Sequence, residues 1–278
     1  MSQVWMITGS SRGLGRHTAI AALEAGHRVA VTARRPDCFG ELERTHGERV
    51  LPVPLDVTDP DAAQRAVERT CEVFGRLDVV VNNAGQADLG AIEDTPLDSF
   101  AAQVATNFWG VVHVTRAALP VLRRQGSGHF VQVSSLGGRM GTPGLAAYQA
   151  AKAAVNTFSL SLAKEVRPLG LKVTLAEPGD LRTGILGKQS MTVLPRSEPY
   201  EEAVGAVAGR LMGHHGRQPG DPARAAAAIV RVAAMTEPPE RLVLGSDALA
   251  FAEAAARELA ASDARWRDLS ASVDFPAE

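Results

Sequence analysis

The chain alternates between short apolar runs typical of buried strands and longer runs whose apolar residues recur at helical spacing. A strand, a helix and a further strand in this order form a parallel sheet covered by helices, so the alternation restricts the fold severely. We therefore predict an α/β fold, a doubly wound parallel sheet of about seven strands with helices on both faces. The strand-type runs lie at residues 3–7, 28–33, 50–55, 77–81, 129–134, 171–176 and 241–244.

Helices are predicted between and after these strands. Asp59 and Pro60 supply an N-cap and a first helical residue for a helix that reaches about residue 74. Asp247 would cap a last helix, and residues 262–278 would form a loosely ordered tail. The other helices are expected at about 14–25, 97–124 with a break or bend near Pro120, 145–166 and 222–235.

The composition shows no break or repeat that would mark a second domain, so we predict one domain over residues 1–278, with residues 247–278 as its C-terminal helix and tail. A formal net charge of -2 without a long Lys or Arg run argues against nucleic acid or an anionic membrane as partner. No run reaches the ~18 apolar residues of a membrane span, and no signal peptide precedes the first strand. The expected location is the cytoplasm.

The two cysteines give no disulfide framework and no metal-ligand spacing. Cys71 falls on the apolar stripe of a predicted helix and is interpreted as a core residue. His214 and His215 are adjacent, so their side chains would point apart, and no Asp, Glu or Cys stands at ligand spacing. No metal site is expected.

A glycine-rich turn, TGSSRGLG at residues 8–15, lies between the first predicted strand and the first helix. Its glycines allow unusual backbone angles and a close approach of the main chain to a pyrophosphate. The N–H groups and the positive dipole end of the following helix also attract an anion. Such a turn alone is weak evidence, but its position at the start of the alternating pattern predicts a dinucleotide site.

The residues after the second strand indicate which dinucleotide binds. An acidic residue there would bond the ribose 2′-hydroxyl and repel a 2′-phosphate, but no acid occurs before Asp37. Arg34 can pair with a phosphate, and Arg12 in the turn is a second candidate. We expect NADP(H) as cofactor in preference to NAD(H), with ordinary surface arginines as the alternative interpretation.

Tyr148 and Lys152 are four residues apart in a predicted helix, so they share one face of it. Ser134 and Ser135 end a strand, where side chains reach the crevice in which such sheets bind ligands. Each residue alone has a purely structural explanation. Their order and spacing together indicate a catalytic group.

With these residues in this order, the chain resembles the short-chain dehydrogenase/reductase family, in its single-domain branch with a Rossmann fold. The likeness is close over residues 3–183 and covers the remainder in outline. The turn matches the family's TGxxxGxG, and Ser135 stands thirteen residues before Tyr148, the usual spacing. The other matches are Tyr148-Gln149-Ala150-Ala151-Lys152 for YxxxK, Asp56-Val57 for an adenine-contacting pair, Asn82-Asn83-Ala84-Gly85 for NNAG, Asn107 for a helix Asn, and Pro178-Gly179 with Thr183 for PGxxxT.

The resemblance implies a role for each matched residue. Tyr148 would be the general acid in carbonyl reduction and the general base in alcohol oxidation, while Ser135 would bond the substrate oxygen. Lys152 would bond the nicotinamide ribose and, with the oxidised nicotinamide, lower the pKa of Tyr148, and Asn107 would hold a water that links Lys152 to solvent. The expected cofactor contacts are Gly9, Ser11, Arg12, Gly13, Leu14, Gly15, Arg34, Asp56, Val57, Asn83, Ala84, Gly85, Tyr148, Lys152, Pro178, Gly179 and Thr183.

Family position also bears on the less regular parts of the chain. Residues 184–220, interrupted by Pro and Gly, would form a lid over the substrate pocket rather than a plain linker. Asp180 stands where many relatives carry a bulkier apolar residue, so the pocket edge would be unusual. A homodimer or homotetramer would form through the long helices around Asn107 and Lys152. The candidate apolar residues of the lid are Leu186, Met191, Leu194, Leu211 and Met212.

Taken together, the residues and the resemblance favour an NADP(H)-dependent oxidoreductase. It would transfer a hydride between the nicotinamide and a small-molecule ketone, aldehyde or secondary alcohol, as a ketoreductase does. Two alternatives stay open, a catalytically inactive nucleotide-sensing regulator and a lyase, epimerase or dehalogenase on the same scaffold. A proton relay of Ser135, Tyr148, Lys152 and Asn107 is of no use to a sensor, which argues against the first.

Overall fold

The computed structural model describes residues 2–184 and 191–275. Its centre is a seven-stranded sheet with the order β3-β2-β1-β4-β6-β7-β9, in which all neighbouring strands are parallel. This confirms the predicted doubly wound α/β fold and all seven predicted strands. The strands are β1 (Val4–Ile7), β2 (Arg28–Ala33), β3 (Val50–Pro54), β4 (Val79–Asn82), β6 (Gly128–Val133), β7 (Leu171–Pro178) and β9 (Arg241–Leu244).

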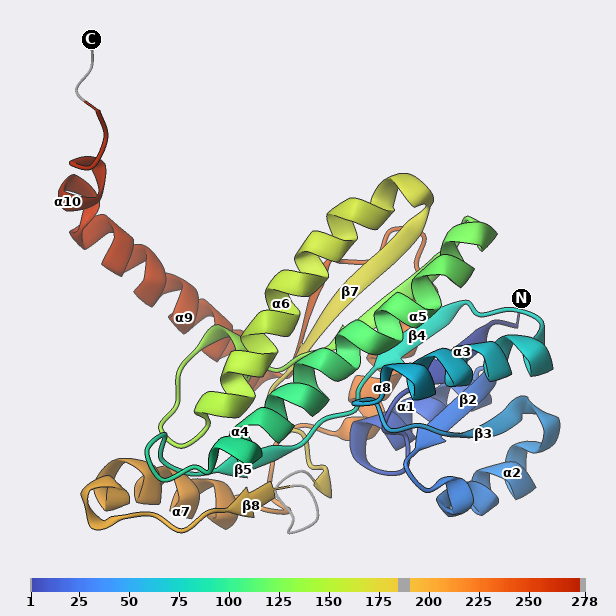
Figure 1. Cartoon of the computed structure of the whole chain (residues 1–278), viewed down its shortest axis with the longest axis horizontal. Helices are drawn as coiled ribbons and strands as arrows, with labels where there is room; N and C mark the ends of the chain where they lie inside the picture. Colours follow the sequence, from blue (N-terminus) through green and yellow to red (C-terminus); the bar gives the residue numbers. More distant parts are fainter. Residues whose placement is uncertain (1, 185–190, 276–278) are drawn as a thin grey trace.

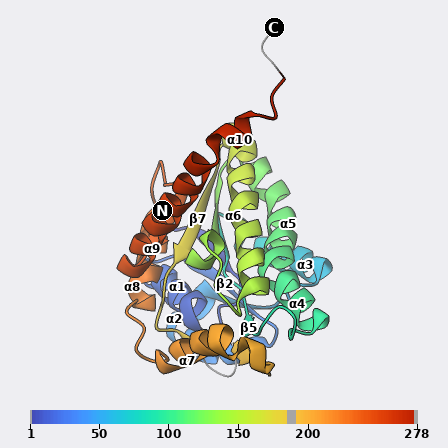
Figure 2. The same ribbon diagram turned by 90° about the vertical axis from the view of Figure 1, so that its left-hand side faces the viewer.

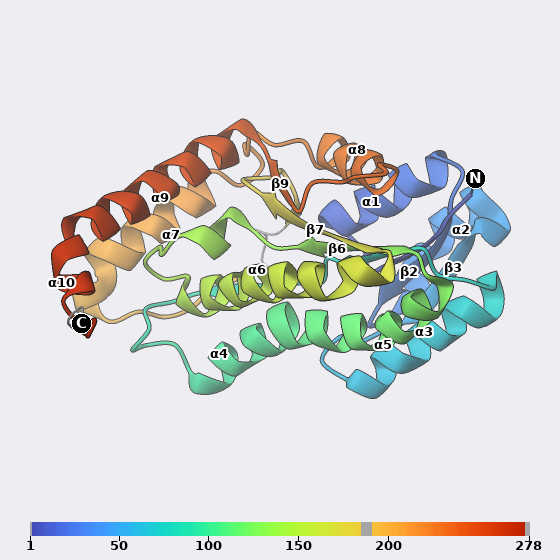
Figure 3. The same cartoon turned by 90° about the horizontal axis from the view of Figure 1, so that it is seen from above.

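Helices cover both faces of the sheet, as Figures 1 and 3 show. One apolar layer lies between the sheet and α3, α5 and α6, and the other lies between the sheet and α1, α2 and α8. Burial on both faces explains why the strand sequences are apolar throughout instead of alternating with polar residues. These helices are α1 (Gly13–Glu24), α2 (Gly40–His46), α3 (Pro60–Phe74), α5 (Gly110–Gln125), α6 (Ala146–Val166) and α8 (Pro222–Ala233).

Short helical turns complete the connections, and the sequence pattern predicted none of them, nor α2. Asp59 caps α3 as predicted, since its carboxylate accepts a hydrogen bond from the backbone N of Asp61 at 2.8 Å. Cys71 of α3 packs beside the core, and burial raises the pKa of its thiol. The 3₁₀ turns of this part of the chain are η1 (Pro36–Phe39), η2 (Gly47–Arg49), η4 (Leu136–Arg139) and η5 (Arg167–Leu169).

The predicted long helix over residues 97–124 is divided, but not at Pro120. It consists of α4 (Leu97–Val104), a π-helical turn η3 (Ala105–Trp109) and α5, which runs through Pro120. Pro120 is exposed, so water can bond the carbonyl that a proline leaves without its helical partner. The wider turn at η3 is the irregular point of this helix, and it carries Asn107.

The described part of residues 184–220 is more regular than we predicted. β8 (Met191–Val193) pairs in parallel with β5 (Ala87–Leu89) in a small second sheet. The elements that follow are η7 (Glu198–Tyr200), the π-helical turn η8 (Glu201–Gly205) and α7 (Ala206–Gly213). Their apolar residues bury against those of β5, which orders a segment that Pro and Gly interrupt; the buried residues are Ala87, Leu89, Ala91, Met191, Val204, Val207 and Ala208.

The C-terminal part is also more helical than we predicted. α9 (Ser246–Arg265) and α10 (Arg267–Ala271) extend away from the body of the molecule, as Figure 1 shows, and Figure 2 views them from their own side. The predicted loose tail over 262–278 is therefore wrong for residues 262–271. Ala, Glu and Arg dominate α9 and favour a helix, although Ala248 and Ala252 are its only buried residues. Asp247 is not the cap, because Gly245 is the N-cap residue and Asp247 lies in the first turn.

Among the residues that the structure describes, no helix combines the length and the apolar character needed to cross a membrane.

Phe130 in β6 is 0% exposed and lies among the apolar residues beneath α3, α5 and α6. We predict that Phe130→Ala lowers the free energy of unfolding by about 3–5 kcal/mol, because it removes buried apolar contacts and leaves a cavity. Phe275→Ala is the matched control, since Phe275 is 97% exposed. Urea unfolding of both variants checks this, and equal losses of stability would contradict the assigned core.

Candidate active site

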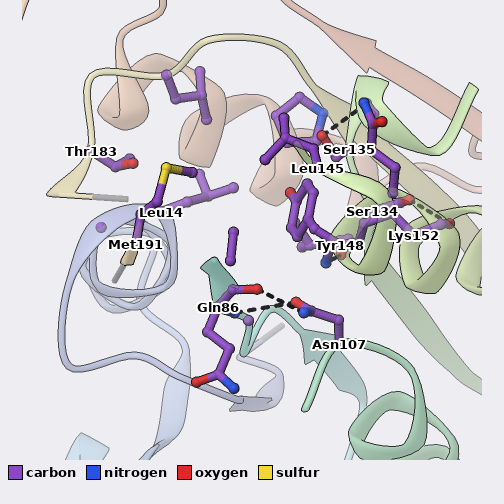
Figure 4. A pocket seen from close by; sticks show the side chains of 18 of the residues that line it. Leu14, Gln86, Asn107, Ser134, Ser135, Leu145, Tyr148, Lys152, Thr183 and Met191 are labelled. Atoms are coloured by element: carbon purple, nitrogen blue, oxygen red, sulfur yellow. Dashed lines mark hydrogen bonds between the residues drawn. The ribbon is translucent and has the colours of Figure 1, made fainter. Parts of the chain in front are cut away.

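One cavity of about 900 Å³ extends along the carboxyl ends of the central strands. From β1 the following strands are added toward one edge of the sheet, and from β4 toward the other. Doubly wound sheets bind their ligands where the strand order reverses in this way. Figure 4 shows side chains that line it. All four predicted catalytic residues line the cavity, as does every predicted cofactor contact except Gly15: Gly9, Ser11, Arg12, Gly13, Leu14, Arg34, Asp56, Val57, Asn83, Ala84, Gly85, Asn107, Ser135, Tyr148, Lys152, Pro178, Gly179 and Thr183.

Gly15 does not line the cavity but packs against Asn83 and Gly9, which do. A Cβ atom on Gly15 would collide with the side-chain amide of Asn83 and lie 2.6 Å from the carbonyl oxygen of Gly9. Gly9 itself has a φ of 63°, and a Cβ there would lie 2.8 Å from the Cα of Ala84. These two glycines let the turn after β1 press against the segment after β4, which leaves a smooth cradle in front of the α1 N-terminus.

Thr8 and Asn83 hold this cradle together. The Thr8 hydroxyl oxygen accepts hydrogen bonds from the backbone N of Asn83 at 2.8 Å and of Ala84 at 3.0 Å. In return, Nδ2 of Asn83 donates to the carbonyl oxygens of Thr8 at 2.9 Å and Gly9 at 3.2 Å. The cavity and its glycine cradle therefore fit an extended dinucleotide, with its pyrophosphate at α1.

At the end of the cavity near β2 and β3, Arg34 is an exposed lining residue beside Asp56. One carboxylate oxygen of Asp56 accepts hydrogen bonds from the backbone N and the hydroxyl of Thr58, at 3.0 and 2.7 Å. Asp37 does not line the cavity. Arg34 thus places a positive charge on the cavity wall just after β2.

Ser135 and Tyr148 meet at the other end of the cavity. Ser135 is the N-cap of η4, where its Oγ accepts a hydrogen bond from the backbone N of Gly137 at 3.0 Å. Its neighbour Ser134 is turned to α6, donating to Oδ1 of Asn156 at 2.6 Å and to the carbonyl oxygen of Lys152 at 3.2 Å. Burial raises the pKa of Tyr148, and a hydrogen bond with Ser135 acts against that rise.

Lys152 is 3% exposed and lies one helical turn from Tyr148. Its Nζ donates to the carbonyl oxygen of Val133 at 2.9 Å and lies 5.8 Å from the centre of the Tyr148 ring. Burial lowers the pKa of Lys152 to about 8. In the protein alone, loss of water thus disfavours the charged forms of both Tyr148 and Lys152, and the predicted lowering of the Tyr148 pKa, which includes the charge of the oxidised nicotinamide, stays a prediction.

Asn107 is fully buried at the π-helical turn. Its Nδ2 donates to the carbonyl oxygens of Gln86 at 2.7 Å and Gln103 at 2.8 Å, and its Oδ1 accepts from the backbone N of Gln86 at 3.2 Å. A Cβ atom on Gly85 would lie 2.8 Å from Oδ1 of Asn107 and 3.8 Å from Nζ of Lys152. The absence of a side chain at Gly85 therefore keeps the space between these two polar groups open.

The substrate end of the cavity is formed largely by residues that the sequence analysis did not single out. Of the candidate lid residues, Met191 and Leu211 line it, Leu194 and Met212 do not, and Leu186 lies outside the described residues. Helical spacing from Leu211 within α7 was the signal that could have identified Val207 and His214 as further lining residues. The lining residues that were not predicted to lie in the pocket include Met140, Thr142, Leu145, Gln149, Val207, Arg210, His214 and Phe251.

Asp180 and Asp247 lie together at the edge of the cavity. The carboxylate of Asp247 accepts a hydrogen bond from the backbone N of Asp180 at 2.7 Å, which fastens the loop after β7 to the start of α9. Burial, and to a smaller extent the charge of Asp247, raise the pKa of Asp180. In residues 2–184 and 191–275, no three His, Cys, Asp or Glu side chains gather as a metal site would require.

A glycine cradle at the switch point of a parallel sheet, in a cavity that a Tyr–Lys pair also lines, is the arrangement of a nucleotide-binding α/β protein. The chain belongs to the short chain dehydrogenase family, whose model matches residues 3–193, and it is an oxidoreductase of that family. Members of this family bind NAD or NADP.

Similar proteins include relatives from bacteria and a fungus. The chain is 51% identical to Oxidoreductase BOA17 of Botryotinia fuckeliana over 97% of this chain and 98% of that protein. It is 36% identical to the 3-ketodihydrosphingosine reductase of Bacteroides thetaiotaomicron, over 87% and 88% of the two chains. The crystal structure of a short-chain dehydrogenase from Streptomyces avermitilis superposes with a TM-score of 0.93 at 38% identity, over 99% and 100% of the two chains.

The lowered pKa of Lys152 makes stability depend on pH in a defined direction. Between pH 8 and about 10.5 the unfolded chain binds more protons at Lys152 than the folded protein does, so stability rises with pH across this window. We predict that wild type gains up to roughly 3 kcal/mol in free energy of unfolding over Lys152→Met as the pH rises from 8 to 10.5. Urea unfolding at several pH values measures this gain. If the difference in free energy of unfolding between the two proteins stays constant with pH, the pKa of Lys152 is not lowered by burial.

Proposed function

We propose that this protein transfers a hydride between NADP(H) and a small-molecule ketone, aldehyde or secondary alcohol, with Tyr148 as the acid or base. One observation carries the proposal. Tyr148, Ser135, Lys152 and Asn107 line one end of the cavity that the glycine cradle also lines. A substrate carbonyl beside Ser135 and Tyr148 would therefore lie within the same enclosure as the nicotinamide of an extended dinucleotide.

The cofactor supplies the hydride when it is bound, and the side chains supply position, charge and the proton. In reduction, the hydroxyl of Ser135 bonds the substrate oxygen and the phenol of Tyr148 gives its proton to that oxygen. In oxidation, the phenolate of Tyr148 accepts the proton of the alcohol. A positive nicotinamide next to the phenol favours the phenolate, opposing the effect of burial on its pKa.

Lys152 and Asn107 would return the proton. With a pKa of about 8, Lys152 exchanges protons more readily at neutral pH than an ordinary lysine does. The open space at Gly85, between Asn107 and Lys152, gives room for a water that continues the path to solvent. This supports a relay from Tyr148 through Lys152.

The preference for NADP(H) rests on charge. Arg34 offers a guanidinium at the ribose end of the cavity, Arg12 stands in the turn, and Asp37 does not line that end. The elements from β8 to α7 would act as the substrate lid, since Val207 and Leu211 face the cavity from α7. A homodimer or homotetramer through α4, α5 and α6, located in the cytoplasm, completes the proposal.

The alternatives differ in one assay. An inactive nucleotide sensor binds NADPH without oxidising it, and a lyase or epimerase converts its substrate without net change of the cofactor. The loss of NADPH absorbance with a panel of ketones and aldehydes separates the three functions. Turnover of NADPH supports the proposal, and substrate conversion without it favours the lyase.

We predict that Tyr148→Phe lowers kcat by at least ~10²-fold, because the general acid is lost, and leaves the affinity for NADPH nearly unchanged. The chain has two tyrosines, so Tyr200→Phe is a matched control. Tyr200 donates its hydroxyl to Glu93 at the surface and does not line the cavity. NADPH turnover and fluorescence titration measure the two effects. Full activity of Tyr148→Phe would refute its role.

For the cofactor, Arg34→Asp should weaken NADPH binding by about 1.5–3 kcal/mol and NADH binding much less, because a charge-assisted bond to the 2′-phosphate is lost. Arg35→Asp introduces the same charge change one residue away, at an exposed residue that does not line the cavity. Dissociation constants for both cofactors test this. A wild type that prefers NADH, or equal effects of the two variants, would count against the assignment of Arg34.

A further inference from the structure

Besides Lys152, a second buried charged group lies behind η4, the turn that Ser135 caps and that we call the serine turn. Glu177, near the end of β7, is 0% exposed. Its carboxylate accepts hydrogen bonds from Nε of Arg139 at 2.7 Å, from Nη1 of Arg241 at 3.1 Å and from Nδ2 of Asn156 at 3.3 Å. Nη2 of Arg139 also bonds its second oxygen, so the contact with Arg139 is bidentate.

These partners come from the segments that build the active site. Arg139 is the last residue of η4, the turn that Ser135 caps. Asn156 lies on α6 one turn beyond Lys152 and accepts the hydrogen bond of Ser134. Glu177 itself directly precedes Pro178 and Gly179, which line the cavity. A single carboxylate thus connects the serine turn, the helix of Tyr148 and Lys152, and the loop after β7.

The turn η4 packs closely on α6, where Nδ2 of Asn156 donates to the carbonyl oxygen of Gly138 at 3.2 Å. A Cβ atom on Gly138 would lie 2.7 Å from Nδ2 of Asn156 and 3.0 Å from the carbonyl carbon and oxygen of Lys152. Because Gly138 leaves no space for a side chain, the position of the turn on α6, and that of Ser135 with it, depends on how Asn156 and Arg139 are held.

Stability alone is a weak reason for such a group. A buried ion pair gains little over apolar residues of similar size, because removing both charges from water offsets their attraction. A carboxylate that accepts from three side chains does, however, fix their relative positions. We propose that Glu177 is a positioning residue, which through Arg139 and Asn156 sets the place of the Ser135 hydroxyl relative to the Tyr148 phenol. This inference rests on the function proposed above for Ser135 and Tyr148.

Glu177→Gln keeps the size of the side chain but removes its charge and turns an N–H₂ group toward the guanidinium groups. We expect kcat for the best carbonyl substrate to fall by about 10- to 100-fold, because small displacements of reacting groups have large effects on rate. The KM for NADPH should change by less than about threefold, because the cradle at Gly9 and Asn83 is untouched. In alcohol oxidation, the pH of half-maximal kcat should rise, since the displaced Ser135 hydroxyl no longer favours the phenolate.

Asp78→Asn is the matched control for loss of a buried carboxylate. Asp78 is 9% exposed, is paired with Arg76 at 2.7 Å and accepts from the backbone N of Val4 at 2.8 Å. It stands just before β4, at the end of the sheet opposite the cavity. This variant should lose stability and keep the kcat and pH profile of wild type.

Hydrogen–deuterium exchange supplies a readout without turnover. Glu177→Gln should exchange faster than wild type at residues 135–141, whereas Asp78→Asn should not. Arg139→Lys keeps the positive charge but has a single nitrogen to donate, so its kcat should fall between those of wild type and Glu177→Gln. If Glu177→Gln does not fold, Arg139→Lys replaces it in the test.

Wild-type kcat and exchange in Glu177→Gln, or equal losses of kcat in Glu177→Gln and Asp78→Asn, would overturn the positioning role. If wild type itself oxidises no NADPH with any carbonyl, the proposed function fails, and the exchange data still decide whether Glu177 holds the turn.

Discussion

The parallel pairing of β1 with β4 is the constraint on which the site depends. These two strands begin the two halves of the sheet, and the chain leaves their carboxyl ends in opposite directions. The Thr8 hydroxyl connects the two ends by accepting hydrogen bonds from the backbone N of Asn83 and of Ala84, and Gly9 allows a close contact with Ala84. Because the two strand ends are fixed to one another, the glycine cradle at α1 has one shape. The Tyr–Lys pair on α6 therefore faces a cradle of fixed shape across the cavity.

The parts of this design that the sequence revealed are local. Fully buried strands produce continuous apolar runs, a capped helix begins with Asp59 and Pro60, and two side chains four apart share a face once a helix forms. The glycine turn is equally local, since its conformation is set within eight residues. The choice of Ser135 came from the family's usual spacing to Tyr148, and in the structure its neighbour Ser134 donates to Asn156.

The features that the sequence did not reveal depend on contacts between distant segments. α7 is ordered by burial against β5, more than one hundred residues earlier in the chain, so its Pro and Gly neighbours indicated a loop. The three partners of Glu177 come from η4, α6 and β9, and nothing in the local pattern of any one of them shows the ion pairs. The effect of burial, which raises the pKa of Tyr148 in the protein alone, was likewise not visible in the sequence, because desolvation is a property of the assembled core.

The projecting helix α9 has its base inside the active site and its far end in solvent. Asp247 in its first turn holds the loop after β7, and Phe251 one turn later lines the cavity, while from Glu253 onward the helix has no buried residue. The backbone hydrogen bonds of α9 run without a break from these residues to its exposed end. A molecule bound to the outer turns of α9 would therefore be connected to the loop after β7 and to the cavity without touching the sheet.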